Sequence, residues 1–203
     1  MNGNTRLSLW SRLLNAAARA PRHTTASPEP HCHAPEEPFC CDLGSLSLIE
    51  VSDAAALAGE LFKNAFRSEI PRLPRHFVLL RRPPDAVATT LGYVHYTRND
   101  SVYLAGGLVV SAMEFRRLDD ATADLVRQQG GMAEWLMRTT CNLLGSEAEA
   151  IFAYMGDAKS IRVNTRVGFG FTGRTHLYVL WKNCTNSDRK SAIIERVAAL
   201  GPF

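Results

Sequence analysis

Four short stretches rich in apolar residues in the first half of the chain predict β-strands, and in the third of them apolar and polar residues alternate. These stretches cover residues 46–51, 76–81, 90–97 and 102–110. A helix through Leu57 and Phe66 is predicted after the first strand, with Asp53 as its N-cap. Short connections join the last three strands, which predicts an antiparallel meander. Gly106 and Gly107 interrupt the last strand and predict a β-bulge or a close backbone approach.

The second half of the chain predicts alternating helices and strands. A helix-period stripe is formed by Ala133, Leu136, Met137, Thr140, Cys141 and Leu144, and Gly145 ends it. Further elements are expected as a strand at 149–155, a helix at 157–168, a strand at 175–181 and a helix at 188–200. The expected fold class is therefore α/β, with a mixed, mostly antiparallel central sheet flanked by helices.

A glycine-containing loop leads into the striped helix. From Gln128 its spacing is Q-x-x-G-x-A, and the loop comprises Gln128, Gln129, Gly130, Gly131, Met132 and Ala133. Small residues at a helix start let an anion approach the unpaired backbone N–H groups, where the helix dipole also favours negative charge. The loop is a candidate phosphate site, although a glycine pair before an amphipathic helix is also common in a plain turn.

The order of elements over about residues 45–182 resembles the fold of the GNAT acetyltransferases, and loop 128–133 is similar to the pyrophosphate loop of that family. Residues 157–169 resemble its late segment N-x-x-A-x-x-L-Y-x-x-x-G-F, with Gly168 and Phe169 in register. The resemblance implies acetyl-CoA or another acyl-CoA as substrate and no metal. It also implies direct attack of an amine on a thioester held between two splayed strands, here 108–110 and 150–154.

The same resemblance implies the site residues. Contacts with acyl-CoA are expected from Leu108, Val109, Val110, Gln128, Gln129, Gly130, Gly131, Met132, Ala133 and Asp157. Glu114 and His95 are candidate bases for the amine, and Tyr154 is a candidate acid for the departing thiolate. The alternatives to these catalytic roles are structural. Glu114 would be a solvated loop acid, His95 a strand residue with one face exposed to solvent, and Tyr154 a ring packed in the core. His176 and Trp181 are further candidates for an acceptor pocket.

Three departures from the family pattern bear on function. Asn164 stands where the family usually has the tyrosine that protonates the thiolate, and Asp157 stands where it often has asparagine. A helix-like insert at 113–128 also lengthens the connection before the loop. Two alternatives to N-acyl transfer to a small-molecule or protein amine therefore stay open. One is a GNAT-fold protein with impaired catalysis that binds acyl-CoA or a partner, and the other is an enzyme like the long-chain acyl-amino-acid or acyl-homoserine-lactone synthases.

Charge and composition divide the chain at about residue 42. The net charge is +3, but residues 1–28 contain four arginines and no acid, so the remainder carries −1 and nucleic-acid binding is not expected. Residues 1–42 are expected to be a disordered basic and Pro-rich extension, and 43–203 the folded domain. A basic amphipathic segment at 1–20 leaves a transit peptide or a membrane-surface anchor as alternatives.

The five cysteines are an odd number in a chain without a signal-peptide pattern, which favours a reducing compartment and a cytoplasmic location. His31, Cys32, His33, Cys40 and Cys41 are soft ligands that lie near one another. They lack the C-x-x-C or H-x₃-H spacing of zinc sites, so no metal centre is expected.

Overall fold

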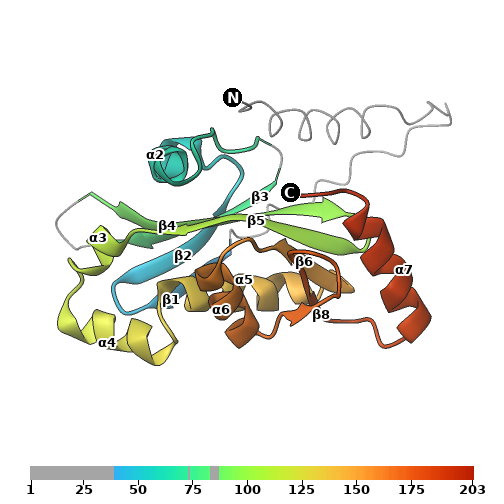
Figure 1. Cartoon of the computed structure of the whole chain (residues 1–203). Coiled ribbons are helices and arrows are strands. Elements are labelled where there is room, and N and C mark those ends of the chain that lie inside the picture. Colours follow the sequence, from blue (N-terminus) through green and yellow to red (C-terminus); the bar gives the residue numbers. More distant parts are fainter. Residues whose placement is uncertain (1–38, 73, 83–86) are drawn as a thin grey trace, which may run out of the picture. The chain divides into compact units, whose positions relative to one another are not determined.

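The computed structural model describes residues 39–72, 74–82 and 87–203. In this part of the chain, one sheet has the strand order β1-β2-β3-β4-β5-β6-β8-β7 (Figure 1). Its strands are β1 (Cys40–Leu43), β2 (Leu46–Val51), β3 (Arg75–Arg81), β4 (Thr89–Asn99), β5 (Val102–Val110), β6 (Ala150–Tyr154), β7 (Gly170–Phe171) and β8 (Leu177–Trp181). All neighbouring strands pair antiparallel except β5 and β6, which are parallel. The mixed, mostly antiparallel sheet predicted from the sequence is confirmed.

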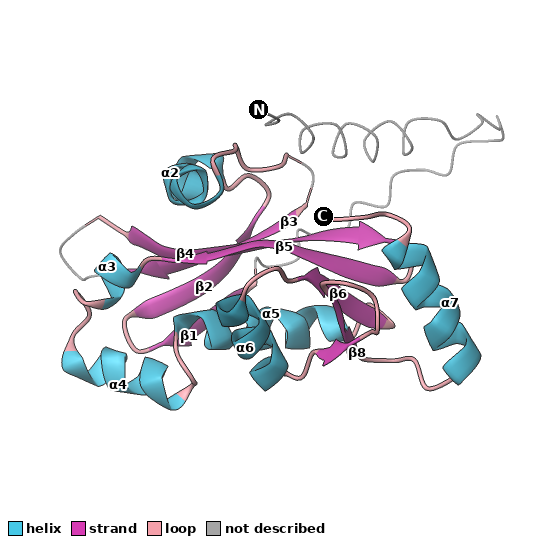
Figure 2. Ribbon diagram, viewed as in Figure 1, coloured by secondary structure: helices cyan, strands magenta, loops and turns pink. Residues whose placement is uncertain are grey.

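Helices cover both faces of this sheet (Figure 2). They are α2 (Ala55–Phe66), α3 (Ala112–Phe115), α4 (Asp120–Gln128), α5 (Met132–Gly145), α6 (Ala158–Val167) and α7 (Ser187–Ala198). The predicted order of strands and helices is found, with β1 and the two-residue β7 in addition. Among the described residues, no helix has the length and the apolar character needed to cross a membrane.

The two faces of the sheet follow from strand alternation. Phe77 and Leu79 of β3 join the core beneath α5, whereas Val78 and Leu80 join the core beneath α2. On the α5 side, the predicted stripe is buried except for the half-buried Ala133, and Leu136 and Leu144 are fully inaccessible to solvent. A continuous core therefore holds α5 against the strands that the site uses.

The sheet begins earlier than the sequence predicts. Order was expected from about Ser45 and a domain boundary at 42/43, but residues 40–43 form β1 and pair antiparallel with β2. Phe39, Cys41 and Leu43 alternate toward the core beneath α5, and the Phe39 ring contacts Phe77 edge to face at 6.1 Å. Four residues are too short a stretch to show a two-residue period. The predictions for residues 1–38, namely a disordered extension, a transit peptide or a membrane-surface anchor, lie outside the described residues.

Removing β1 should destabilise the domain. We expect a chain that begins at Gly44 to melt about 5–10 °C below one that begins at Pro38, because it lacks the Phe39–Phe77 contact and the 3.2 Å hydrogen bond from Glu50 N–H to the Phe39 carbonyl. Thermal melts followed by circular dichroism measure the difference. Equal melting temperatures would mean that β1 adds nothing to the stability of the sheet.

Candidate functional site

The parallel strands β5 and β6 pair along only part of their length. Their last pair is Ala105 with Ala153, but β5 continues to Val110 and β6 ends at Tyr154. Within the described residues, β6 has no pair with β5 beyond Ala105. The β6-facing edge of β5 therefore lies open from Gly106 to Val110, at the place predicted for the splayed strands.

A β-bulge lies where this pairing ends. Tyr93 pairs with Val109 and His95 with Gly106, so β5 has one more residue than β4 between the two pairs. Gly107 has a φ of 61°, and a Cβ there would lie 2.4 Å from Cε2 of Phe62. A Cβ on Gly106 would lie 2.6 Å from Nε2 of His95. The predicted bulge and close approach are both confirmed, and the bulge turns the β5 backbone at the start of its open edge.

The three β5 residues predicted to contact acyl-CoA lie along this edge. Leu108 and Val110 pack against the core beneath α5, and Val109 packs against the core beneath α2. All three side chains are half-buried. The open edge therefore combines backbone polar groups with apolar side chains on both faces of the sheet.

Tyr154 ends β6 beside the opening, and its half-buried ring lies 5.6 Å from the ring of His176. His176 has a φ of 61°, which is unfavourable for a residue with a side chain. Met155 holds it there, donating its N–H to the His176 carbonyl at 2.8 Å and placing its own carbonyl 3.1 Å from Nδ1. Trp181 lies elsewhere, against Phe152.

Glu114 is buried. The alternative interpretation, that it is a solvated loop acid, is therefore wrong. Its carboxylate accepts a 2.8 Å hydrogen bond from Nη1 of Arg117 and lies 3.9 Å from Nη2 of Arg81. Its backbone N–H donates to Oγ of Ser111, the N-cap of α3. These contacts anchor α3 to the end of β3, and they favour a structural role over that of a free base.

His95 is also not exposed to solvent on either side. It is only 2% exposed and lies beneath α2. Its ring centroid lies 5.9 Å from that of Phe62 and 5.7 Å from that of Tyr93. Burial, with a smaller effect of His76, lowers the pKa of His95 to about 3. A base that takes a proton from an amine near neutral pH needs a higher pKa, so this environment does not favour the predicted catalytic role.

The glycine loop joins two helices. The helix-like insert predicted at 113–128 forms the helices α3 and α4, so Gln129 to Gly131 connect α4 to α5 instead of following β5 directly. Gly130 and Gly131 have φ values of 86° and 102°, which favour glycine. No side chain caps α5. The first backbone hydrogen bond of α5 runs from the Trp135 N–H to the Gly131 carbonyl at 3.0 Å. The N–H groups of residues 132–134 come before this bond and have no acceptor within the helix.

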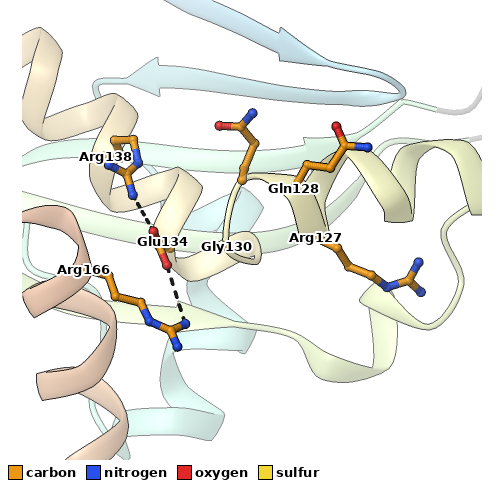
Figure 3. A pocket seen from close by; sticks show the side chains of 7 residues that line it. Arg127, Gln128, Gly130, Glu134, Arg138 and Arg166 are labelled. Carbon is orange, nitrogen blue, oxygen red and sulfur yellow. Dashed lines mark hydrogen bonds and ion pairs between the residues drawn. The ribbon is translucent and has the colours of Figure 1, made fainter.

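A polar surface cavity of about 370 Å³, wide open to solvent, lies at this loop. It is lined by Arg127, Gln128, Gln129, Gly130, Glu134, Arg138 and Arg166. Three arginines and one glutamate give this lining a formal net charge of +2. Figure 3 shows Arg138 and Arg166 on opposite sides of Glu134. A cationic cavity at a helix start without a side-chain cap can bind an anion such as a phosphate group.

The charged residues of this cavity were not predicted from the sequence as parts of a binding site. Glu134 and Arg138 are four residues apart, a spacing that predicts an ion pair on one helix face. Arg166 comes from α6, and only the packing of α6 against α5 brings it to the loop. Met132 is largely buried and contributes to the core beneath α5, so only its backbone is available to a ligand.

Asp157 and Asn164 are both engaged within α6. Asp157 is the N-cap, and it accepts hydrogen bonds from the N–H groups of Lys159 at 2.8 Å and Ser160 at 3.0 Å. Hydrogen bonding, chiefly by the Ser160 side chain, lowers the pKa of Asp157. Asn164 is buried and donates from Nδ2 to the Ser160 carbonyl at 2.9 Å. Its Oδ1 has no hydrogen-bond partner among the described residues.

The described residues contain no group of three or more histidine, cysteine or acidic side chains that are placed to hold a metal ion. Cys40 and Cys41 are free cysteines on β1. The other ligands considered from the sequence, His31, Cys32 and His33, lie outside the described part of the chain.

Comparison with solved structures finds several similar chains. A chain in a solved structure titled "The crystal structure of KacTA-DNA complex" is 16% identical, with a TM-score of 0.47. The match covers 74% of the present chain and 99% of that chain. No family model and no curated protein matches the sequence. The fold assignment therefore rests on the order and pairing of the strands.

Proposed function

We propose that this protein is an acyl-CoA-dependent N-acyltransferase that moves an acyl group, acetyl in the first instance, to an amine. The observation that carries the proposal is the parallel pair β5 and β6, whose pairing stops at Ala105 and Ala153 while β5 continues through a bulge. An open strand edge of this kind offers backbone donors and acceptors to the amide-containing arm of CoA and to the thioester carbonyl.

The cavity at the start of α5 supplies the second half of the binding site. In this proposal, the pyrophosphate lies against the N–H groups of Met132 and Ala133, where Gly131 leaves room for it. Arg138 and Arg166 neutralise its charge. Acyl-CoA is a substrate here, and no metal takes part.

The transfer step needs only positioning and two proton movements. The amine nitrogen attacks the thioester carbonyl, and its surplus proton passes to water. The carbon–sulfur bond then breaks, and the departing thiolate takes a proton from the Tyr154 hydroxyl, which is restored from solvent. Because a thiol has a pKa of about 8.5, the thiolate is already a fair leaving group, and most of the rate comes from holding amine and thioester together.

Replacement of Tyr154 by phenylalanine should lower turnover about 10- to 100-fold, at the lower end of what acid–base catalysis contributes, with little change in acyl-CoA affinity. The measurement is thiol release from acetyl-CoA with a panel of amines. Tyr178→Phe removes a hydroxyl from a half-buried ring on β8 that contacts Phe171, and should leave turnover unchanged. Equal rates for wild type and Tyr154→Phe would remove Tyr154 from the reaction.

A second candidate function is acyl-CoA binding without transfer, and Asn164 favours it. This residue is buried at the position where the resemblance places a tyrosine acid, and an amide does not donate a proton to a thiolate. If the wild type binds CoA but releases no thiol with any amine, and Asn164→Tyr creates release, the binding function replaces the catalytic one.

A further inference from the structure

Two aromatic rings fill the space on the α2 side of the β5 bulge. Helix α2 packs against β4 and β5, and its residue Phe62 is only 5% exposed. A Cβ on Gly107 would lie 2.4 Å from Cε2 of Phe62 and 2.7 Å from Cε1 of His95. A Cβ on Gly106 would lie 2.6 Å from Nε2 of His95. Atoms that are not bonded to one another do not approach so closely, so no further atom fits between the rings and the backbone of the bulge.

The opening between β5 and β6 begins at this same bulge, since the open edge of β5 runs from Gly106 to Val110. Val110 is the end that lies near α5. A Cβ on its strand partner Gly92 would be 3.2 Å from Cγ1 of Val110 and 3.4 Å from Cδ2 of Leu136, near the start of α5. On the proposed function, the phosphates of acyl-CoA lie at that helix start. The arm of the ligand therefore follows the edge from Val110 toward Gly106.

The acyl group, which is the far end of the ligand, then lies at the closed end of the opening. Ahead of it, β5 and β6 are joined by the pair Ala105 and Ala153. Both alanines belong to the packed core beneath α5. On the opposite face of the sheet, the rings of Phe62 and His95 cover the bulge. The space beyond the thioester carbonyl is therefore bounded by strand pairing ahead and by packed side chains on both faces.

We propose that Phe62 limits the length of the acyl group, so that the site takes acetyl or propionyl groups and rejects hexanoyl and longer chains. The use of acyl-CoA rests on the proposed function, and the limit on chain length is the added claim. A longer chain would need the space that the Phe62 ring occupies. That ring is held between Phe66 and Tyr93, with centroids 4.7 and 5.5 Å away. The claim also decides against an enzyme like the long-chain acyl-amino-acid synthases.

Titration calorimetry of the full chain with acetyl-CoA and with hexanoyl-CoA tests the claim, because binding needs no acceptor amine. Wild type should bind acetyl-CoA more tightly than hexanoyl-CoA. Phe62→Ala removes the ring and leaves a space beside the bulge for the chain. Since each buried methylene group adds roughly fourfold in affinity, we expect this variant to gain about 10-fold or more for hexanoyl-CoA, with little change for acetyl-CoA.

Phe62→Leu and Phe77→Leu are a matched pair of milder variants. Phe77 is also buried, but it joins the core beneath α5, on the other face of the sheet. We expect roughly a threefold gain for hexanoyl-CoA in Phe62→Leu, less than one buried methylene group contributes, and none in Phe77→Leu. The pair decides the matter if Phe62→Ala does not fold. An unchanged affinity in Phe62→Leu, or the same gain in both variants, overturns the claim.

Transfer assays with the same thioesters separate this claim from the proposed function. If the affinities follow chain length and Phe62 as expected but no thioester acylates any amine, the role of Phe62 stands and the transferase assignment fails. If acetyl-CoA acylates an amine but neither chain length nor Phe62→Ala changes the affinity, the transferase assignment stands and the role of Phe62 fails. Failure of wild type to bind any CoA species would overturn both.

Discussion

Replacement of Gly107 by alanine should lower the free energy of unfolding by about 3 kcal/mol or more. A φ of 61° costs a residue with a Cβ about 1–2 kcal/mol. The new Cβ would also lie 2.4 Å from Cε2 of Phe62 and 2.7 Å from Cε1 of His95, and overpacking of this kind costs about 1–3 kcal/mol. Urea unfolding at constant pH measures the loss. Because Gly107 forms the bulge beside the open edge of β5, the same change should also weaken CoA binding.

Gly173→Ala is the matched control for backbone strain. Gly173 has a φ of 83°, but a Cβ there would meet no atom within 4 Å. Its loss of stability should therefore be limited to about 1–2 kcal/mol. Equal losses for the two variants would show that Phe62 and His95 move aside easily and that the bulge is not tightly packed.

Gly131→Asp is expected to have the largest effect on ligand binding, lowering CoA affinity at least 100-fold. The added carboxylate would lie at the start of α5, where it repels the phosphates and competes for the N–H groups of residues 132–134. Titration calorimetry of the full chain with CoA gives the affinities. Gly131→Ala has the same positive φ of 102° without the charge, and nothing lies within 4 Å of its Cβ, so it should lose far less affinity. Retained affinity in the aspartate variant would place the pyrophosphate elsewhere.

Much of this fold was predictable because local patterns and tertiary packing agree. The apolar run at 76–81 predicted β3, whose strand geometry puts Phe77 and Val78 on opposite faces of the sheet, and the helix stripe predicted that Leu136 and Leu144 lie on one face of α5. The glycine pair of β5 predicted a bulge, because residues other than glycine rarely adopt the backbone angles that a bulge can require. β1 was missed because four residues carry too little periodicity, and pairing with β2 supplies what its sequence does not.

The candidate site was less predictable because burial and long-range pairing are not local properties. The loop at 128–133 was found from its small residues, but Arg166 reaches it only through the packing of α6 on α5. His95 and Glu114 were selected by residue type and position. Neither the cover of α2 over His95 nor the pair of arginines around Glu114 can be read from neighbouring residues.

A crystal structure of the full chain grown with CoA tests the central claim most directly, because it locates both ends of the ligand at once. We predict that the pyrophosphate lies against the backbone from Gly130 to Ala133, within reach of Arg138 and Arg166. We also predict that the sulfur lies between the open edge of β5, beyond Ala105, and Tyr154 at the end of β6. CoA bound at any other surface, or a thiol arm that does not enter between β5 and β6, would contradict the account.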